Sequence, residues 1–154
     1  MYCHFKIYRM QSSAIANRRD KMIPKYRAWE PETKFMNDQV RVTSNRFGDG
    51  EILIEATDGF GWIEVKPEYL MQSTGLKDKN GVEIFEGDIV IRANEAIGYV
   101  AYLQQEAGFV VVTKKSDYRL GHRNTGETYD VATAHEVIGN ICSKPKLWEQ
   151  ADEN

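Results

Sequence analysis

The side chains best suited to nucleophilic or metal chemistry in this sequence are scattered along it: Cys3, Cys142, His4, His122 and His135. A zinc site needs cysteines and histidines at short, regular spacings, which these residues lack. His135 and Cys142 lie close enough in sequence to suggest a Cys–His pair, but such a pair needs contact in the fold and a third group that orients the base. Asp130 and Glu136 lie near His135 in sequence, but nothing local demands such an arrangement. The sequence therefore predicts no catalytic, metal-binding or cofactor-binding residues and no cofactor, and it favours Cys142 as a small buried hydrophobe.

A second candidate for metal chemistry is the turn around Asp78, Asn80 and Gly81, which looks like the middle of an EF-hand loop. With Gly81 at the glycine position of such a loop, the first ligand would be Leu76 and the bidentate acid would be Gly87. Neither residue carries a carboxylate. The segment is therefore better explained as a tight turn, in which Asn and Gly tolerate positive φ and Asp bonds the backbone two residues on.

Glu86 and Asp88 could form a catalytic carboxylate pair, since they are two residues apart. They flank Gly87, however, and lie between the short strand at Val82–Phe85 and the β-branched strand that begins at Ile89. Acids next to a glycine bend are more simply turn residues. We predict that the two strands meet at a corner formed by Gly87, as strands do in small barrels.

The main basic cluster is the segment Lys114–Arg123, in which the candidate nucleic-acid contacts are Lys115, Tyr118, Arg119 and Arg123. A tyrosine between cations could stack a base while the cations follow the phosphate backbone. The alternative, which we favour, is a solvated hairpin loop. Five basic side chains against one acidic one give residues 1–21 a charge of +4, which leaves −7 for the rest of a chain whose total is −3. An acidic body is a poor match for a duplex backbone.

The elements that must position these residues are short strands bounded by turn residues. We expect a first strand at 25–29, an extended segment at 34–42, hairpins at 52–54 with 62–65 and at 97–104 with 109–113, short strands at 129–131 and 136–141, and helical turns at 67–71 and 145–148. The two helical turns are short, and no long amphipathic helix is predicted. The predicted fold is all-β or β-dominated, with several short strands in coiled sheets and a part like a small barrel.

The domain organisation follows from composition. We expect residues 1–21 to be a disordered basic leader or an extension due to the choice of start site, 22–148 to be a single β-rich domain, and 149–154 to be a polar tail that frays. Two cysteines without a disulfide framework favour a reducing cytoplasm, and no apolar run is long enough to span a membrane.

Three ordered blocks of the sequence resemble the YopX family of phage and prophage proteins from Gram-positive bacteria. The residues that carry the resemblance are Lys25–Trp29 with Lys34 and Met36, Thr74–Gly81 and Glu83–Val90, and Glu136–Ile141 with Pro145 and Leu147. The resemblance spans about residues 23 to 148, and residues 1–21 precede the usual beginning. It implies a β-rich, phage-associated protein without an established activity, and it offers no catalytic residues to carry over.

The leading functional hypothesis is a non-enzymatic protein-interaction module that is encoded by a phage or prophage and acts on a host or phage protein in the host cytoplasm. A nucleic-acid-binding accessory protein that uses the Lys114–Arg123 loop is the alternative, and an uncharacterised enzyme is the third. Exposed sheet edges favour pairing between subunits, so we also expect a homo-oligomer. Trp29, Trp62 and Trp148 are expected to be core or interface anchors.

Overall fold

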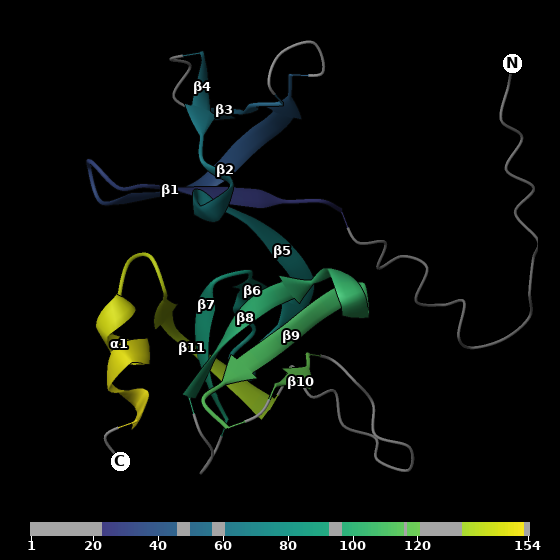
Figure 1. The fold of residues 1–154 in the computed structure, drawn as a ribbon, viewed down its shortest axis with the longest axis vertical. Helices are drawn as coiled ribbons and strands as arrows, with labels where there is room; N and C mark the ends of the chain where they lie inside the picture. The colour runs from purple at the N-terminus through teal and green to yellow at the C-terminus, as the bar shows by residue number, and fades with distance from the viewer. Residues whose placement is uncertain are drawn as a thin grey trace, which may run out of the picture.

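The computed structural model describes residues 23–45, 50–56, 61–92, 97–115, 117–120 and 134–152 (Figure 1). Its elements are β1 (Tyr26–Glu30), β2 (Phe35–Ser44), β3 (Ile52–Ala56), β4 (Trp62–Val65), η2 (Pro67–Tyr69), β5 (Leu70–Lys77), β6 (Glu83–Phe85), β7 (Asp88–Arg92), β8 (Ile97–Leu103), η3 (Gln104–Glu106), β9 (Gly108–Thr113), β10 (Tyr118–Arg119), β11 (His135–Asn140), α1 (Pro145–Glu149) and η5 (Gln150–Asp152). Strands therefore dominate the described part of the chain, as predicted.

The strands form two antiparallel sheets. One has the order β4-β3-β2-β1-β5-β6, and the other has the order β10-β9-β8-β7-β11. Figure 1 shows that β1 to β4 lie together at one end, which we call the N-terminal lobe, and that β6 to β11 lie together at the other end, which we call the barrel lobe. Strand β5 runs from one lobe to the other, and it pairs with β1 at Leu70–Gln72 and with β6 at Ser73 and Lys77.

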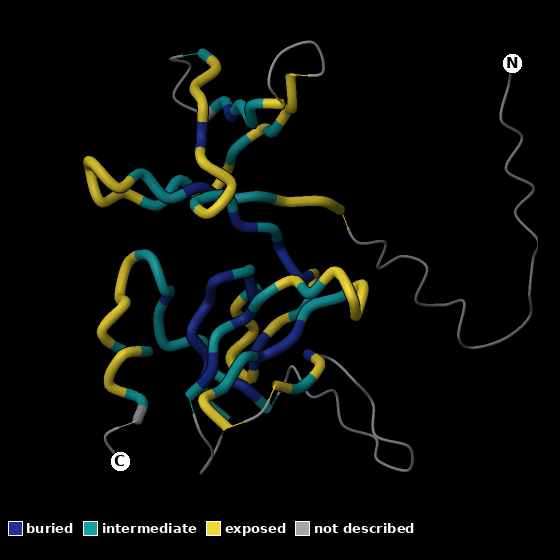
Figure 2. The backbone as a smooth tube through the Cα atoms, in the orientation of Figure 1, coloured by how far each residue is buried: buried dark blue, intermediate teal, exposed yellow. Residues whose placement is uncertain are grey.

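Each lobe has its own apolar core. In the barrel lobe the core contains Ile84, Val90, Val100, Val111 and Leu120, and in the N-terminal lobe it contains Ala28, Ile54 and Val65. β-Branched residues pack well on pleated surfaces, which explains their dominance here. Figure 2 shows most of the buried chain in the barrel lobe, along the strands that surround its core. The barrel lobe thus provides the more deeply buried scaffold.

Gly87 forms the predicted corner between β6 and β7, with a φ of +82°. Its N–H donates to the Val100 carbonyl at 2.7 Å, and its carbonyl accepts from the Ile141 N–H at 2.9 Å. An added Cβ would lie 3.1 Å from Nδ2 of Asn140. A glycine is therefore needed at position 87 for two reasons: it adopts the left-handed conformation, and it has no Cβ to hinder the close approach of the neighbouring chain.

The turn at Asp78 closes the barrel lobe. Oδ1 of Asp78 accepts from the N–H groups of Asn80 at 2.8 Å and Val82 at 2.9 Å, and Oδ2 accepts from the Val137 N–H at 2.9 Å. The Lys79 N–H also donates to the carbonyl of His135 at 2.9 Å. The buried carboxylate of Asp78 thus accepts hydrogen bonds from the backbone N–H groups of its own turn and links this turn to strand β11. The bond to Asn80 is the local one expected from the sequence.

The strand before this turn was not among the predicted elements. It is β5, which spans eight residues, and its pairing with β6 shifts register between Ser73 and Lys77. Gly75, with a φ of +75°, lies within the shift. Burial of Met71, Ser73 and Thr74 explains the length of the strand, because tertiary packing overrides the weak local preference of these residues.

Other predicted elements are confirmed, including the hairpins β3–β4 and β8–β9, the corner β6–β7 and the helical turns η2 and α1. The prediction that the segment Lys114–Arg123 is a solvated hairpin loop is wrong at β10, where Tyr118 pairs with Val111. η5 follows α1 within the predicted tail at 149–154, and residues 153–154 lie outside the described residues. Residues 1–21 and 129–131 lie outside the described residues. Within the described ranges, no helix has the length and apolar character that a membrane crossing requires.

Candidate functional site

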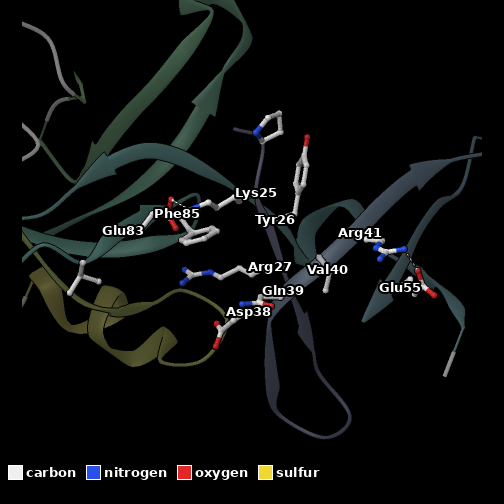
Figure 3. A pocket seen from close by; sticks show the side chains of 12 residues that line it. Lys25, Tyr26, Arg27, Asp38, Gln39, Val40, Arg41, Glu55, Glu83 and Phe85 are labelled. Carbon is white, nitrogen blue, oxygen red and sulfur yellow. Dashed lines mark hydrogen bonds and ion pairs between the residues drawn. The ribbon is translucent and has the colours of Figure 1, made fainter. Parts of the chain in front are cut away.

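A groove of about 900 Å³ lies between the two lobes (Figure 3). Its floor comes from Pro24 and β1, one wall comes from β2 and β3, and the other comes from the Asp78 turn and β6. The lining residues are Pro24, Lys25, Tyr26, Arg27, Asp38, Gln39, Val40, Arg41, Glu55, Val82, Glu83 and Phe85. Strand alternation explains the β6 wall, because Glu83 and Phe85 face the groove whereas Ile84 enters the barrel core.

A bulge in β2 shapes the wall opposite β6. Tyr26 pairs with Val40, but Ala28 pairs with Asn37, so Asp38 and Gln39 together face a single residue of β1. A bulge bends its strand and redirects the side chains at that point. Asp38 and Gln39 both line the groove as a result.

Two ion pairs lie along the groove. Nζ of Lys25 is 3.2 Å from Oε1 of Glu83, and Nη1 of Arg41 is 3.5 Å from Oε2 of Glu55. The Lys25 and Arg41 side chains are 58% and 83% exposed, so each pair contributes at most about 1 kcal/mol to stability. Asp38 is exposed and has no ion-pair partner among the residues that the structure describes.

Arg27 forms a polar joint between the lobes beneath the groove. Its guanidinium lies 4.4 Å from the centroid of the Phe85 ring and pairs with Oδ1 of Asp88, which is 1% exposed. Oδ2 of Asp88 accepts from the Phe85 N–H at 2.9 Å, and Nδ2 of Asn140 lies 3.3 Å from Oδ1. Burial raises the pKa of the Asp88 carboxyl, although the charge of Arg27 and these hydrogen bonds oppose that rise. Asp88, which was predicted as a turn residue, is therefore the first residue of β7 and a buried ion-pair partner.

The groove offers charges of both signs, an amide, a phenol and apolar surface. The described residues that line it include no serine, threonine, cysteine or histidine. Across the described ranges, no group of three or more histidine, cysteine, aspartate and glutamate side chains could hold a metal ion. The arrangement is suited to binding a polypeptide or another amphipathic ligand.

The structure does not bring His135 and Cys142 together. His135 begins β11 and is fully buried, with Nε2 2.6 Å from the Tyr118 hydroxyl oxygen, whereas Cys142 follows the other end of the strand. Six residues of extended chain separate the two ends by roughly 17 Å. Burial raises the pKa of the Cys142 thiol, which makes it a poorer nucleophile.

The candidate nucleic-acid contacts lie in different environments. Lys115 is exposed, but Tyr118 packs against the barrel core and bonds His135. Arg119 pairs with the carboxylate of Glu106. Arg123 lies outside the described residues. Nucleic-acid binding by this segment stays a prediction.

Sequence reasoning did not identify the groove as a site. Its walls come from segments that are far apart along the chain, and the β2 bulge has no glycine or proline to mark it. The available signal was Arg27, a charged residue in the middle of the predicted strand 25–29. A buried partner was predictable for such a residue, but its identity was not.

Comparison with known proteins identifies relatives of the whole described domain. The family described as YopX protein matches residues 25–149. The crystal structure of protein EF1440 from Enterococcus faecalis is similar, with 26% sequence identity and a TM-score of 0.50 over 83% of this chain and 99% of that one. No curated protein matches. The ordered sequence blocks, the two-sheet fold and the extent of the match agree, and the chain belongs to the YopX family.

Proposed function

We propose that this protein is a non-enzymatic interaction module, encoded by a phage or prophage, that binds an extended segment of a host or phage protein in the host cytoplasm. The groove between the lobes carries the proposal. It combines apolar side chains with charged ones, which is the composition of protein-recognition surfaces. The resemblance to phage and prophage proteins supports the origin, and the sparse cysteines support a reducing compartment.

The construction of the groove favours a polypeptide ligand. Val82 is 49% exposed although it is apolar, and it stands beside the charged residue Glu83 on the same wall. An extended chain presents successive side chains to opposite faces, so it can place apolar groups on Val82 and keep polar groups at the edges. An open groove bounded by two strand walls accommodates such a chain along its length.

Affinity capture from phage-infected host cells tests the proposal, with wild-type protein compared with Val82→Glu. Phe35→Glu is the matched control, because Phe35 is 58% exposed and lies outside the groove lining. The expected result is a partner that is captured by wild type and by Phe35→Glu but not by Val82→Glu, and that binds again when purified. Thermal unfolding of all three proteins establishes that they are folded. Equal capture by the three proteins contradicts the proposal.

Self-association is a second part of the proposal, and edge strand β4 supports it. β4 ends the first sheet, and Trp62 and Ile63 are 48% and 45% exposed there. Large apolar side chains at a sheet edge favour pairing with another chain. Light scattering after size-exclusion chromatography should give a mass of two or more subunits for wild type and of one subunit for Trp62→Glu. A wild type that stays monomeric over the whole range of concentrations tested counts against this part.

A further inference from the structure

We infer that the groove selects a basic segment: an extended stretch of partner polypeptide in which a lysine or arginine lies beside Asp38 and apolar side chains lie over Val82. This inference rests on the proposed function and adds the chemistry of the ligand. The observation behind it is that the cations of the groove are more exposed than the carboxylates they pair with.

The carboxylates of the groove are held in place more firmly than its cations. Glu83 is on a short side chain and accepts a hydrogen bond from the Ser73 hydroxyl at 3.0 Å, and its side chain is 29% exposed. Glu55 is similarly 28% exposed. Their partners Lys25 and Arg41 are long and well exposed, so they can swing into solvent at little cost. A ligand therefore meets fixed negative charges and movable positive ones.

Asp38 adds a negative charge that no cation in the described chain balances. The third cation, Arg27, is only 14% exposed and is already committed to Asp88. With Arg27 neutralised in this way, the groove presents Asp38, Glu55 and Glu83 against the two mobile cations. This balance favours a basic ligand over an acidic one by direct charge complementarity.

The same balance disfavours nucleic acid in the groove. Tyr26 and Phe85 could suggest stacking, but Phe85 is 8% exposed and one cation, Arg27, already lies over its ring. A phosphate backbone would meet the three carboxylates on both walls. Single-stranded DNA is therefore a poor match for the groove.

Selection from a display library of random 12-residue peptides tests the inference. The immobilised baits are wild type, Val82→Glu, Asp38→Lys and the Phe35→Glu control. The expected result is enrichment of peptides that combine lysine or arginine with apolar residues on wild type and on Phe35→Glu, and loss of that enrichment on Val82→Glu. Asp38→Lys should shift the selected charge towards aspartate and glutamate. Purified selected peptides should bind Asp38→Asn about two- to fivefold more weakly than wild type, the range for one exposed ion pair.

The outcomes separate this inference from the proposed function. Enrichment of acidic or uncharged peptides that still depends on Val82 overturns the basic preference and leaves a peptide-binding groove. Enrichment that is unaffected by Val82→Glu overturns both. Displacement of the selected peptides by labelled oligothymidine, with a steep salt dependence, also overturns the inference, because it assigns the groove to nucleic acid. Asp38 is exposed and has no ion pair in the described chain, so loss of fold by Asp38→Asn, seen as a lowered unfolding temperature, would likewise contradict the role given to this residue.

Discussion

Substitution of Gly87 should unfold the protein at a lower temperature, for two separable reasons. The first is conformation, because Gly87 has a φ of +82°. A residue with a Cβ loses about 1–2 kcal/mol in this left-handed region. The second is space, because the new Cβ would lie 3.1 Å from Nδ2 of Asn140 and 3.5 Å from Cγ1 of Ile141. Asn140 cannot easily give way, since its side chain also contacts Asp88 and bonds the Cys142 N–H.

Other glycines of the same chain provide the controls. Gly81 has a φ of +79° but nothing within 4 Å of an added Cβ, so Gly81→Ala measures the conformational cost alone. Gly108 has no positive φ, and its nearest contact would be an ordinary 3.7 Å, so Gly108→Ala should be close to neutral. The difference between Gly87→Ala and Gly81→Ala then reports the crowding at the corner.

Thermal unfolding followed by circular dichroism measures these costs. A domain of this size loses about 4 °C for each 1 kcal/mol. We expect Gly81→Ala to lower the melting temperature by about 4–8 °C and Gly87→Ala to lower it further. Gly87→Val adds a branched side chain in a packed site, for a total loss of about 3–5 kcal/mol and roughly 12–20 °C. An unchanged melting temperature for Gly87→Val refutes the corner, and equal shifts for Gly81→Ala and Gly87→Ala refute the crowding.

Three further predictions concern buried polar groups. Burial alone would raise the pKa of Asp78, but hydrogen bonds from the Val137, Val82 and Asn80 N–H groups hold it below its usual value. The contribution of Asp78 to stability is therefore present above about pH 4 and is lost as the pH falls through the lowered pKa of the folded state. Asp78→Ala should cost about 3 kcal/mol at pH 7 in urea unfolding and should flatten this dependence of stability on acid pH. Arg27→Met leaves the buried Asp88 carboxylate without its partner and should lower the free energy of unfolding by about 3–5 kcal/mol. The double variant Arg27→Met with Asp88→Asn should lose less stability than Arg27→Met alone. Additive losses in the double-mutant cycle would contradict the interaction between Arg27 and Asp88. Burial raises the pKa of the Cys142 thiol. In a Cys3→Ser variant at pH 8, this thiol should therefore react with a disulfide reagent more slowly than free cysteine does. An equal rate would show that the thiol is not shielded.

The local parts of the fold were predictable from the sequence because single residues mark them. Gly87 marks the corner, and the turn residues between apolar runs mark the hairpins β3–β4 and β8–β9. The Asp78 turn was also visible, and the bonds of its carboxylate to Asn80 and Val82 are local. Its bond to Val137 spans 59 residues, and no local preference encodes that distance.

The candidate site was not predictable for the same reason. The bond that joins the lobes links Arg27 to a residue 61 positions away. Tyr118, a candidate nucleic-acid contact because cations flank it in sequence, has its hydroxyl oxygen 2.6 Å from Nε2 of His135, a residue 17 positions away. A short strand, β10, turns Tyr118 towards the core and leaves the side chain of Arg119 exposed. Period-two alternation predicts such a division once the strand is known, but the polar sequence there concealed the strand.

The position of β11 has a consequence for synthesis on the ribosome. β11 pairs with β7, which is translated more than forty residues earlier, and the Val137 N–H of β11 donates a hydrogen bond to the carboxylate of Asp78. Until β11 leaves the exit tunnel, the nascent chain presents the edge of β7, with Ile89 and Val90, without its final partner. Unpaired apolar edges in incomplete chains are sites of aggregation. Quality control during translation, by chaperones that cover β-strand edges, is therefore most important for this protein in the interval between the emergence of β7 and that of β11.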